Sequence, residues 1–180
     1  VVHRDLAWEA SIESWEWVLG VDLWGPIYGV HAFVPRMIAS GEPGHVVNTA
    51  STAGVVAFPG IASYDVAKQG VVALSEVLLA DAMAEKLPIR VSVLCPGVVR
   101  TKIGVSERNR PGGVKGDAFG EEGLITATEA IEPEAVAQAV LGAINDGTFW
   151  IMTHPRYVDL VKTRAEGMLT GAMPPIPHPI

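Results

Sequence analysis

The chain has 180 residues, 49% of them hydrophobic, and is long enough for one domain with a substantial core. Its formal net charge is -7 and its lysines and arginines form no cluster, which argues against a nucleic-acid-binding surface. No run of about 18 uncharged apolar residues occurs, which argues against a membrane span. The apolar excess therefore predicts helices buried on more than one face, in a sheet sandwich or at a subunit interface.

The cysteine and the first residues bear on where the protein works. Cys95 is the single cysteine and cannot form an internal disulfide, which favours the reducing cytoplasm. The first residues lack the cationic start and apolar core of a signal peptide. Because Val1 is not an initiator methionine, we expect the sequence to start inside a longer protein.

Long helical patterns alternate with short apolar runs. Residues 11–39 carry apolar side chains at three- and four-residue spacings, which predicts one long helix or two in tandem, and Pro26 is expected to kink it. The other segments with a helical pattern are residues 62–85, 133–145 and 156–169.

Three short runs rich in β-branched residues predict buried strands, at residues 45–50, 89–95 and 148–153. The order strand, helix, strand, loop, helix, strand is typical of a parallel α/β architecture. Residues 102–130 are rich in glycine and charge, which predicts a mobile loop with at most a short helix. No internal repeat or second domain is indicated, so residues 1–180 are interpreted as one domain.

Tyr64 and Lys68 are four residues apart near the start of the second long helix, so they share one of its faces. A tyrosine with an ordinary pKa of about 10 is a poor acid or base at neutral pH. A neighbouring ammonium favours the phenolate and lowers that pKa, which makes the pair a candidate proton-transfer device. The pattern also fits an exposed lysine one turn from a half-buried tyrosine.

Polar residues follow the ends of two predicted strands. Ser51 follows the first strand, Pro96 and Gly97 end the second, and Thr101 comes four residues later. Because the carboxyl ends of parallel strands form the ligand crevice, we expect these residues to converge there with the start of the second long helix. In the simpler alternative, Ser51 or Thr52 caps a helix and the Pro-Gly pair makes an ordinary turn.

Three sequence motifs occur together: NTASTAG at residues 48–54, YDVAK at 64–68 and CPGVVRT at 95–101. In sequence, order and spacing they resemble the consecutive active-site motifs of short-chain dehydrogenases/reductases. Residues 15–29 are similar to the long fourth helix of that family, and residues 149–155 resemble a C-terminal strand of many members. The resemblance covers essentially the whole chain and implies a Rossmann-like three-layer sandwich with a parallel sheet.

The resemblance also implies roles for individual residues. Tyr64 would be the acid/base, Lys68 would lower its pKa and bind the nicotinamide ribose, and Ser51 would hold the substrate oxygen. The cofactor, NAD or NADP, would be contacted by Tyr64, Lys68, Pro96, Gly97, Val99 and Thr101. Residues 102–130 would form a substrate lid, and no metal is implied.

Two features depart from the family pattern. Asp22 stands where the family usually has an asparagine that completes a catalytic tetrad. In addition, nothing resembles the glycine-rich turn that holds the pyrophosphate at a helix N-terminus, or the NNAG motif. We therefore expect a partial domain, from the fourth helix to the C-terminus, that lacks the first strand–helix units and is inactive by itself.

The predicted function is an NAD(P)-dependent oxidoreductase that acts on an alcohol or carbonyl compound, as a homodimer or homotetramer joined through the two long helices. The alternative is a non-catalytic, truncated relative that acts only as a subunit partner. A serine hydrolase is disfavoured because no G-x-S-x-G elbow surrounds Ser51. Four large side chains are candidates for an apolar pocket or for the core: Trp24, Phe58, Trp150 and Met152. The histidines have no metal-ligand spacing and are interpreted as structural or exposed: His3, His31, His45, His154 and His178.

Overall fold

A computed structural model describes residues 1–112 and 129–177. Its sheet has three parallel strands in the order β1 (Gly44–Thr49), β2 (Ile89–Cys95) and β3 (Trp150–Met152). Val46 lies opposite Val91 in the first pair, and Leu94 lies opposite Ile151 in the second. The predicted parallel α/β architecture is therefore confirmed for the described part of the chain.

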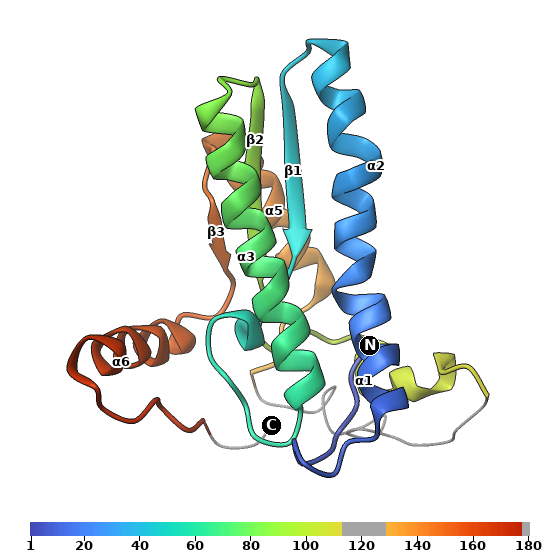
Figure 1. Cartoon of the computed structure of the whole chain (residues 1–180). Coiled ribbons are helices and arrows are strands. Elements are labelled where there is room, and N and C mark those ends of the chain that lie inside the picture. The colour runs from blue at the N-terminus through green and yellow to red at the C-terminus, as the bar shows by residue number, and fades with distance from the viewer. Residues whose placement is uncertain (113–128, 178–180) are drawn as a thin grey trace.

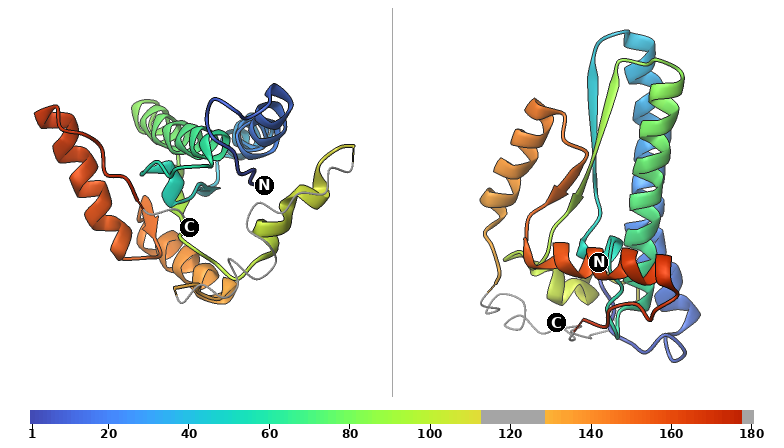
Figure 2. Two further views of the ribbon diagram at one scale, coloured as in Figure 1. Left: turned by 90° about the horizontal axis from the view of Figure 1, so that it is seen from below. Right: turned by 90° about the vertical axis from the view of Figure 1, so that its left-hand side faces the viewer.

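Helices cover both faces of this sheet. Helices α2 (Trp24–Ser40) and α3 (Ala62–Ala84) lie on one face and α5 (Pro133–Asp146) on the other, so the right-hand view of Figure 2 shows three layers. The smaller elements gather at the end to which the strands point (Figure 1): α1 (Ile12–Asp22), η1 (Thr52–Gly54), η2 (Lys102–Asn109) and α6 (Arg156–Thr170).

The helix predicted over residues 11–39 is interrupted a few residues before Pro26, where the kink was expected. Helix α1 ends at Asp22 and α2 begins at Trp24, so the break lies at Leu23 and Pro26 sits in the first turn of α2. Proline has no N–H to donate to the carbonyl four residues before it, which here belongs to Asp22. The interruption therefore falls one turn upstream of Pro26 rather than at it.

The remaining predicted elements differ from the observed ones mainly at their ends. The first strand starts one residue early, at Gly44, and the third is limited to Trp150–Met152 instead of residues 148–153. Within the segment predicted to be a loop, residues 102–109 form the 3-10 helix η2, with Thr101 as its cap. Residues 113–128 of the predicted lid lie outside the described residues.

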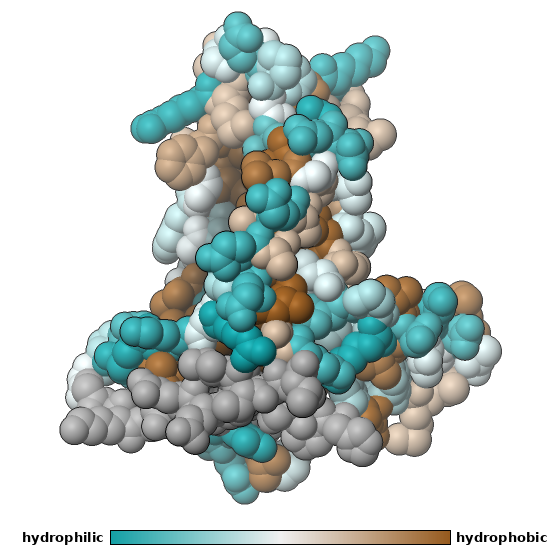
Figure 3. Space-filling view, turned by 180° about the vertical axis from the view of Figure 1, so that it is seen from behind, coloured by the Kyte–Doolittle hydropathy of each residue, from teal (hydrophilic) through white to brown (hydrophobic). Residues whose placement is uncertain are grey.

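The core is divided between the two faces of β2. Val93 and Cys95 are fully buried against Val71 of α3, whereas Leu94 packs with Ile151 and with Ala143 of α5. A strand covered on both faces needs apolar residues at successive positions, as at the end of β2, where Val93, Leu94 and Cys95 follow one another. From behind, polar side chains run down the middle of the molecule, with apolar side chains exposed on both sides (Figure 3).

Gly54 sits where η1 is pressed against α3. A Cβ atom at this position would lie 2.8 Å from the Lys68 carbonyl oxygen and 2.8 Å from Cγ2 of Val72. Gly142, inside α5, has no atom within 4 Å of the equivalent position. The same substitution should therefore have opposite effects at the two sites.

We expect Gly54→Ala to lower the free energy of unfolding by about 1–3 kcal/mol, because the backbone of α3 must move to admit the methyl group. The matched control, Gly142→Ala, should leave stability unchanged or raise it by up to about 1 kcal/mol, since alanine favours a helix. Urea unfolding of both variants measures the difference. A Gly54→Ala protein as stable as the wild type would contradict the close packing of η1 on α3.

Candidate active site

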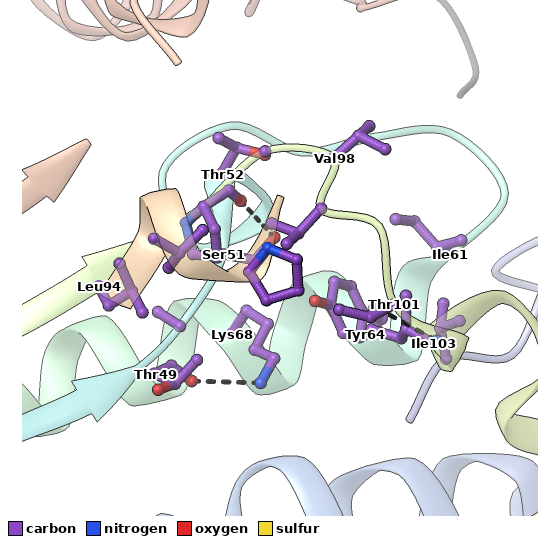
Figure 4. Close-up of a pocket in the computed structure, with 17 residues that line it drawn as sticks. Thr49, Ser51, Thr52, Ile61, Tyr64, Lys68, Leu94, Val98, Thr101 and Ile103 are labelled. Carbon is purple, nitrogen blue, oxygen red and sulfur yellow. Dashed lines mark hydrogen bonds between the residues drawn. The ribbon is translucent and has the colours of Figure 1, made fainter. Parts of the chain in front are cut away.

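A cavity of about 340 Å³ opens at the carboxyl ends of the strands. Its polar lining comes from the ends of β1, from α3 and from the segment after β2, and comprises Thr49, Ser51, Thr52, Tyr64, Lys68 and Thr101. Figure 4 shows Ser51, Tyr64 and Lys68 around the same space. The convergence expected from the sequence is therefore present in the structure.

Helix α3 presents Tyr64 and Lys68 from its first two turns. The Lys68 ammonium lies 5.5 Å from the centre of the Tyr64 ring and donates a hydrogen bond to the carbonyl oxygen of Thr49 at 3.2 Å. Lys68 is only 9% exposed, so the alternative of an exposed lysine does not hold. Its remaining N–H groups are available to the cavity that it lines.

Asp22 provides the counter-charge for this ammonium. Its Oδ2 atom lies 3.7 Å from Lys68 Nζ, and the residue is 5% exposed at the end of α1. Oδ1 accepts a hydrogen bond from the Val1 nitrogen at 2.7 Å, whereas Oδ2 has no hydrogen-bond partner among the described residues. The hydrogen bond to Oδ1 leaves Oδ2 facing Lys68, whose positive charge attracts it.

The electrostatic balance at Tyr64 differs from the sequence-based expectation. Burial raises the pKa of its hydroxyl well above the ordinary value, and the negative charges of Asp22 and Asp65 raise it further, while the Ser51 hydroxyl lowers it. Burial and the two carboxylates, rather than Lys68, set the direction of the shift in this pKa. Tyr64 therefore keeps its proton at neutral pH, where its hydroxyl can donate a hydrogen bond to a ligand oxygen.

Lys68 has the opposite balance. Burial lowers the pKa of its ammonium, because the charged form loses its hydration, and the negative charge of the neighbouring Asp22 carboxylate raises it again. The charge of Lys68 thus depends on Asp22, the residue that replaces the usual asparagine.

Ser51 performs the capping role that the sequence left open. Its Oγ accepts a hydrogen bond from the Ala53 N–H at 3.2 Å, at the start of η1. Its own proton points to the Pro96 carbonyl at 3.5 Å, the outer limit of a hydrogen bond. The hydroxyl also lines the cavity, so a ligand oxygen can replace this weak contact.

The segment after β2 forms another wall of the cavity, made by Pro96, Gly97, Val98, Val99 and Thr101. Thr101 caps η2 by accepting a hydrogen bond from the Ile103 N–H at 3.4 Å. Ile131 pairs with this segment, donating to the Val98 carbonyl at 3.1 Å and accepting from the Arg100 N–H at 2.9 Å. The wall is therefore held from outside by backbone hydrogen bonds.

Sequence reasoning did not find the apolar wall of the cavity, which consists of Val2, Ile61 and Ile103. Ser106 of η2 accepts from the Val2 N–H at 2.9 Å and donates to the Val2 carbonyl at 3.2 Å, across 104 positions of sequence. No local pattern could reveal this pairing. The large side chains named as pocket candidates do not line this cavity: Phe58 is in the core, Met152 packs against it, and Trp24 and Trp150 are exposed.

His154, interpreted from the sequence as structural or exposed, is structural. This histidine follows β3, is 6% exposed and accepts a hydrogen bond from the Gly97 N–H at 3.1 Å. Over the described ranges, no three metal-ligating side chains lie together, and no helix is long and apolar enough to cross a membrane.

Comparison with known proteins agrees with this geometry. Residues 3–112 match the family model described as short chain dehydrogenase. The chain belongs to the short-chain dehydrogenase family. It is 30% identical to the CLA biosynthesis dehydrogenase/reductase of Lactiplantibacillus plantarum over 94% of its own length, and 30% identical to the C alpha-dehydrogenase of a Sphingobium strain over 92%.

Solved structures of short-chain dehydrogenases have the same fold. A Burkholderia phymatum short chain dehydrogenase/reductase in complex with NAD superposes with a TM-score of 0.91 and 30% identity, covering 100% of this chain and 67% of the other. The chain spans 63% and 56% of the lengths of the two curated relatives. The predicted Rossmann-like sandwich is confirmed, and it is incomplete relative to these proteins.

Asp65 adds an unusual ionisation next to the acid/base candidate of this short-chain dehydrogenase. It is 6% exposed, its Oδ2 accepts from the Phe58 N–H at 2.9 Å, and its Oδ1 is buried without a hydrogen-bond partner in the described structure. Burial raises the pKa of this carboxyl to about 7, against the smaller lowering effects of the Phe58 N–H and Arg164. Folding therefore favours the protonated form.

Because the folded-state pKa is raised, the stabilisation from Asp65 is present at low pH and is lost as pH rises toward 7. We expect Asp65→Asn, which stays neutral, to be more stable than the wild type by on the order of 1–3 kcal/mol above pH 7 and equal to it near the ordinary carboxyl pKa. Thermal unfolding between these limits measures the gap, with Asp146→Asn at the exposed end of α5 as the control. A gap that does not change with pH would refute the raised pKa.

Proposed function

We propose that the protein is an NAD(P)-dependent oxidoreductase that transfers a hydride between a nicotinamide cofactor and an alcohol or carbonyl substrate. The observation that carries this proposal is the meeting of three groups in one cavity: the Tyr64 hydroxyl, the Ser51 hydroxyl and the buried Lys68 ammonium. Membership of the short-chain dehydrogenase family supports it, as do the dehydrogenase names of the two curated relatives.

The residues of the cavity fit a nicotinamide nucleoside. A buried ammonium with unused N–H groups suits the hydroxyls of a ribose, and Lys68 has that character beside the Tyr64 hydroxyl. Leu94 and Val136 supply an apolar wall for a ring, and Pro96, Gly97, Val99 and Thr101 supply the turn beside it. When bound, the cofactor supplies or accepts the hydride.

The side chains of the chain supply the proton and the orientation. Tyr64 donates its proton to the carbonyl oxygen during reduction and takes one from the alcohol during oxidation. Ser51 donates a hydrogen bond to the same oxygen, replacing its weak contact with the Pro96 carbonyl. Val2, Ile61 and Ile103 receive an apolar part of the substrate.

The exposed apolar residues of α2 support a homo-oligomer. Trp24, Tyr28 and Phe33 are 49%, 62% and 63% exposed, and Val77 of α3 is 58% exposed. A second copy of the subunit would remove these side chains from water, as a dimer or as part of a tetramer. The unpaired, buried Cys95 supports a place in the reducing cytoplasm.

The second candidate, a non-catalytic subunit partner, rests on the same exposed helix surface without using the cavity. It predicts that the polar groups of the cavity can be changed without consequence for any reaction. Substitution of Tyr64 therefore separates the two candidates.

Tyr64→Phe in the complete natural protein should reduce turnover on the order of 10²–10⁴-fold, because the ring remains and only the proton donor is lost. The affinity for NAD(P)H should stay close to that of the wild type. Steady-state rates and a cofactor titration measure the two effects, and Tyr28→Phe, on the exposed side of α2, is the matched control. A Tyr64→Phe enzyme with a normal rate would remove Tyr64 from the acid/base role.

Asp22→Asn should move the alkaline limb of alcohol oxidation to lower pH while activity is retained. The negative charge of Asp22 raises the pKa of Tyr64, so removing it makes the phenolate easier to form. The measurement is kcat/KM against pH, with Asp81→Asn, an exposed position of α3, as the control. Superimposable profiles would make Asp22 a bystander, and a shift to higher pH would show that the predicted sign is wrong.

A further inference from the structure

His154 connects three segments that are far apart in the sequence. It lies directly after β3 and is buried. Its Nδ1 atom accepts a hydrogen bond from the Gly97 N–H at 3.1 Å and lies 2.8 Å from the Thr153 hydroxyl. Its Nε2 atom lies 3.2 Å from the carbonyl oxygen of Glu129. One imidazole ring thus joins the turn after β2, the end of β3 and the segment that begins at Glu129.

These contacts determine the protonation of the ring. A backbone N–H can only donate, so Nδ1, which faces the Gly97 N–H, must carry a lone pair. A carbonyl oxygen can only accept, so Nε2, which faces Glu129, must carry the proton. His154 is therefore a neutral imidazole with an acceptor on one side and a donor on the other.

The ring is also in tight contact with Gly97. A Cβ atom at Gly97 would lie 2.8 Å from Cγ and Nδ1 of His154, and 2.8 Å from Cε2 of Tyr157 in α6. Only glycine fits against this pair of rings, so the backbone of the turn is placed by them. Gly97 itself lines the cavity, whereas His154 does not.

The Glu129 segment closes the arrangement. Two positions after Glu129, Ile131 forms backbone hydrogen bonds with Val98 and Arg100 of the same turn, and the Glu129 carboxylate pairs with Arg156 at the start of α6. The turn is therefore held at Gly97 by His154 and at Val98 by Ile131. The contact of His154 Nε2 with the Glu129 carbonyl joins these two residues, because Glu129 is two positions before Ile131.

We propose that His154 is a positioning residue that holds the Gly97 turn in the shape that receives the nicotinamide end of the cofactor. This inference rests on the proposed function. In this role His154 does not contact the cofactor, and it does not affect binding of the ADP-ribose part of the dinucleotide. A change at His154 should therefore weaken binding of the whole dinucleotide and spare a ligand that lacks the nicotinamide ring.

The test uses the complete natural protein and two ligands: the reduced cofactor that the wild type binds, and the matching ADP-ribose, with or without the 2′-phosphate. His154→Leu removes all three polar contacts of the ring, with Gly97, Thr153 and Glu129. His154→Asn keeps an oxygen acceptor near the position of Nδ1, and His154→Gln instead reaches the position of Nε2. His31→Leu, at an exposed position of α2, is the control.

We expect His154→Leu to raise the Kd of the reduced cofactor by about tenfold or more, because the half-buried Gly97 N–H loses its acceptor. The Kd of ADP-ribose should stay within about twofold of the wild-type value. Asn should restore most of the affinity for the reduced cofactor, and Gln should not. If the Leu variant does not fold, the Asn and Gln variants still carry the comparison.

Equal weakening of both ligands in the His154 variants, or an Asn variant no better than Gln, would overturn the positioning role. These outcomes would leave the proposed function intact, because the wild type would still bind both ligands. A wild-type protein that binds neither ligand would instead overturn the proposed function, and the role of His154 with it.

Discussion

Burying the Lys68 ammonium beneath the strand ends costs free energy that only nearby oxygen atoms can offset. The Thr49 carbonyl and the Asp22 carboxylate are those oxygen atoms, and they belong to the end of β1 and the end of α1. The position of the ammonium therefore requires that β1, α1 and α3 meet at one place. The same requirement sets the position of Tyr64, one turn earlier on α3.

The parallel sheet supplies the second condition, because all its strands end at one edge. Ser51 follows β1, the Pro96–Val99 turn follows β2, and His154 follows β3. Each strand thus delivers one part of the site: a hydroxyl, a cavity wall and the support behind that wall. The hydrogen bond from Gly97 to His154 makes the third strand part of the site although its own side chains do not line the cavity.

The part that could be predicted from the sequence is the part encoded locally. Hydrophobic periodicity indicates α3 and β2 closely, and the spacing of Tyr64 and Lys68 places both on one helix face. The break at Leu23 was misplaced because proline acts on the carbonyl four residues before it. The pairing of Val2 with Ser106 and the contact of His154 with Gly97 join residues 104 and 57 positions apart, which no local pattern encodes. The direction of the Tyr64 pKa shift likewise depends on a sum of burial and charges in three dimensions.

The buried Lys68 ammonium beside Tyr64 is the group that we propose binds the nicotinamide nucleoside. A fluorescence titration of the complete natural protein with NADH and NADPH, for the wild type and for Lys68→Met, tests this assignment. We expect saturable binding of at least one of the two cofactors by the wild type, and binding about tenfold weaker or worse in Lys68→Met, which loses the donor to the ribose. Saturable binding that is unchanged in Lys68→Met, or no binding of either cofactor by the wild type, would contradict it.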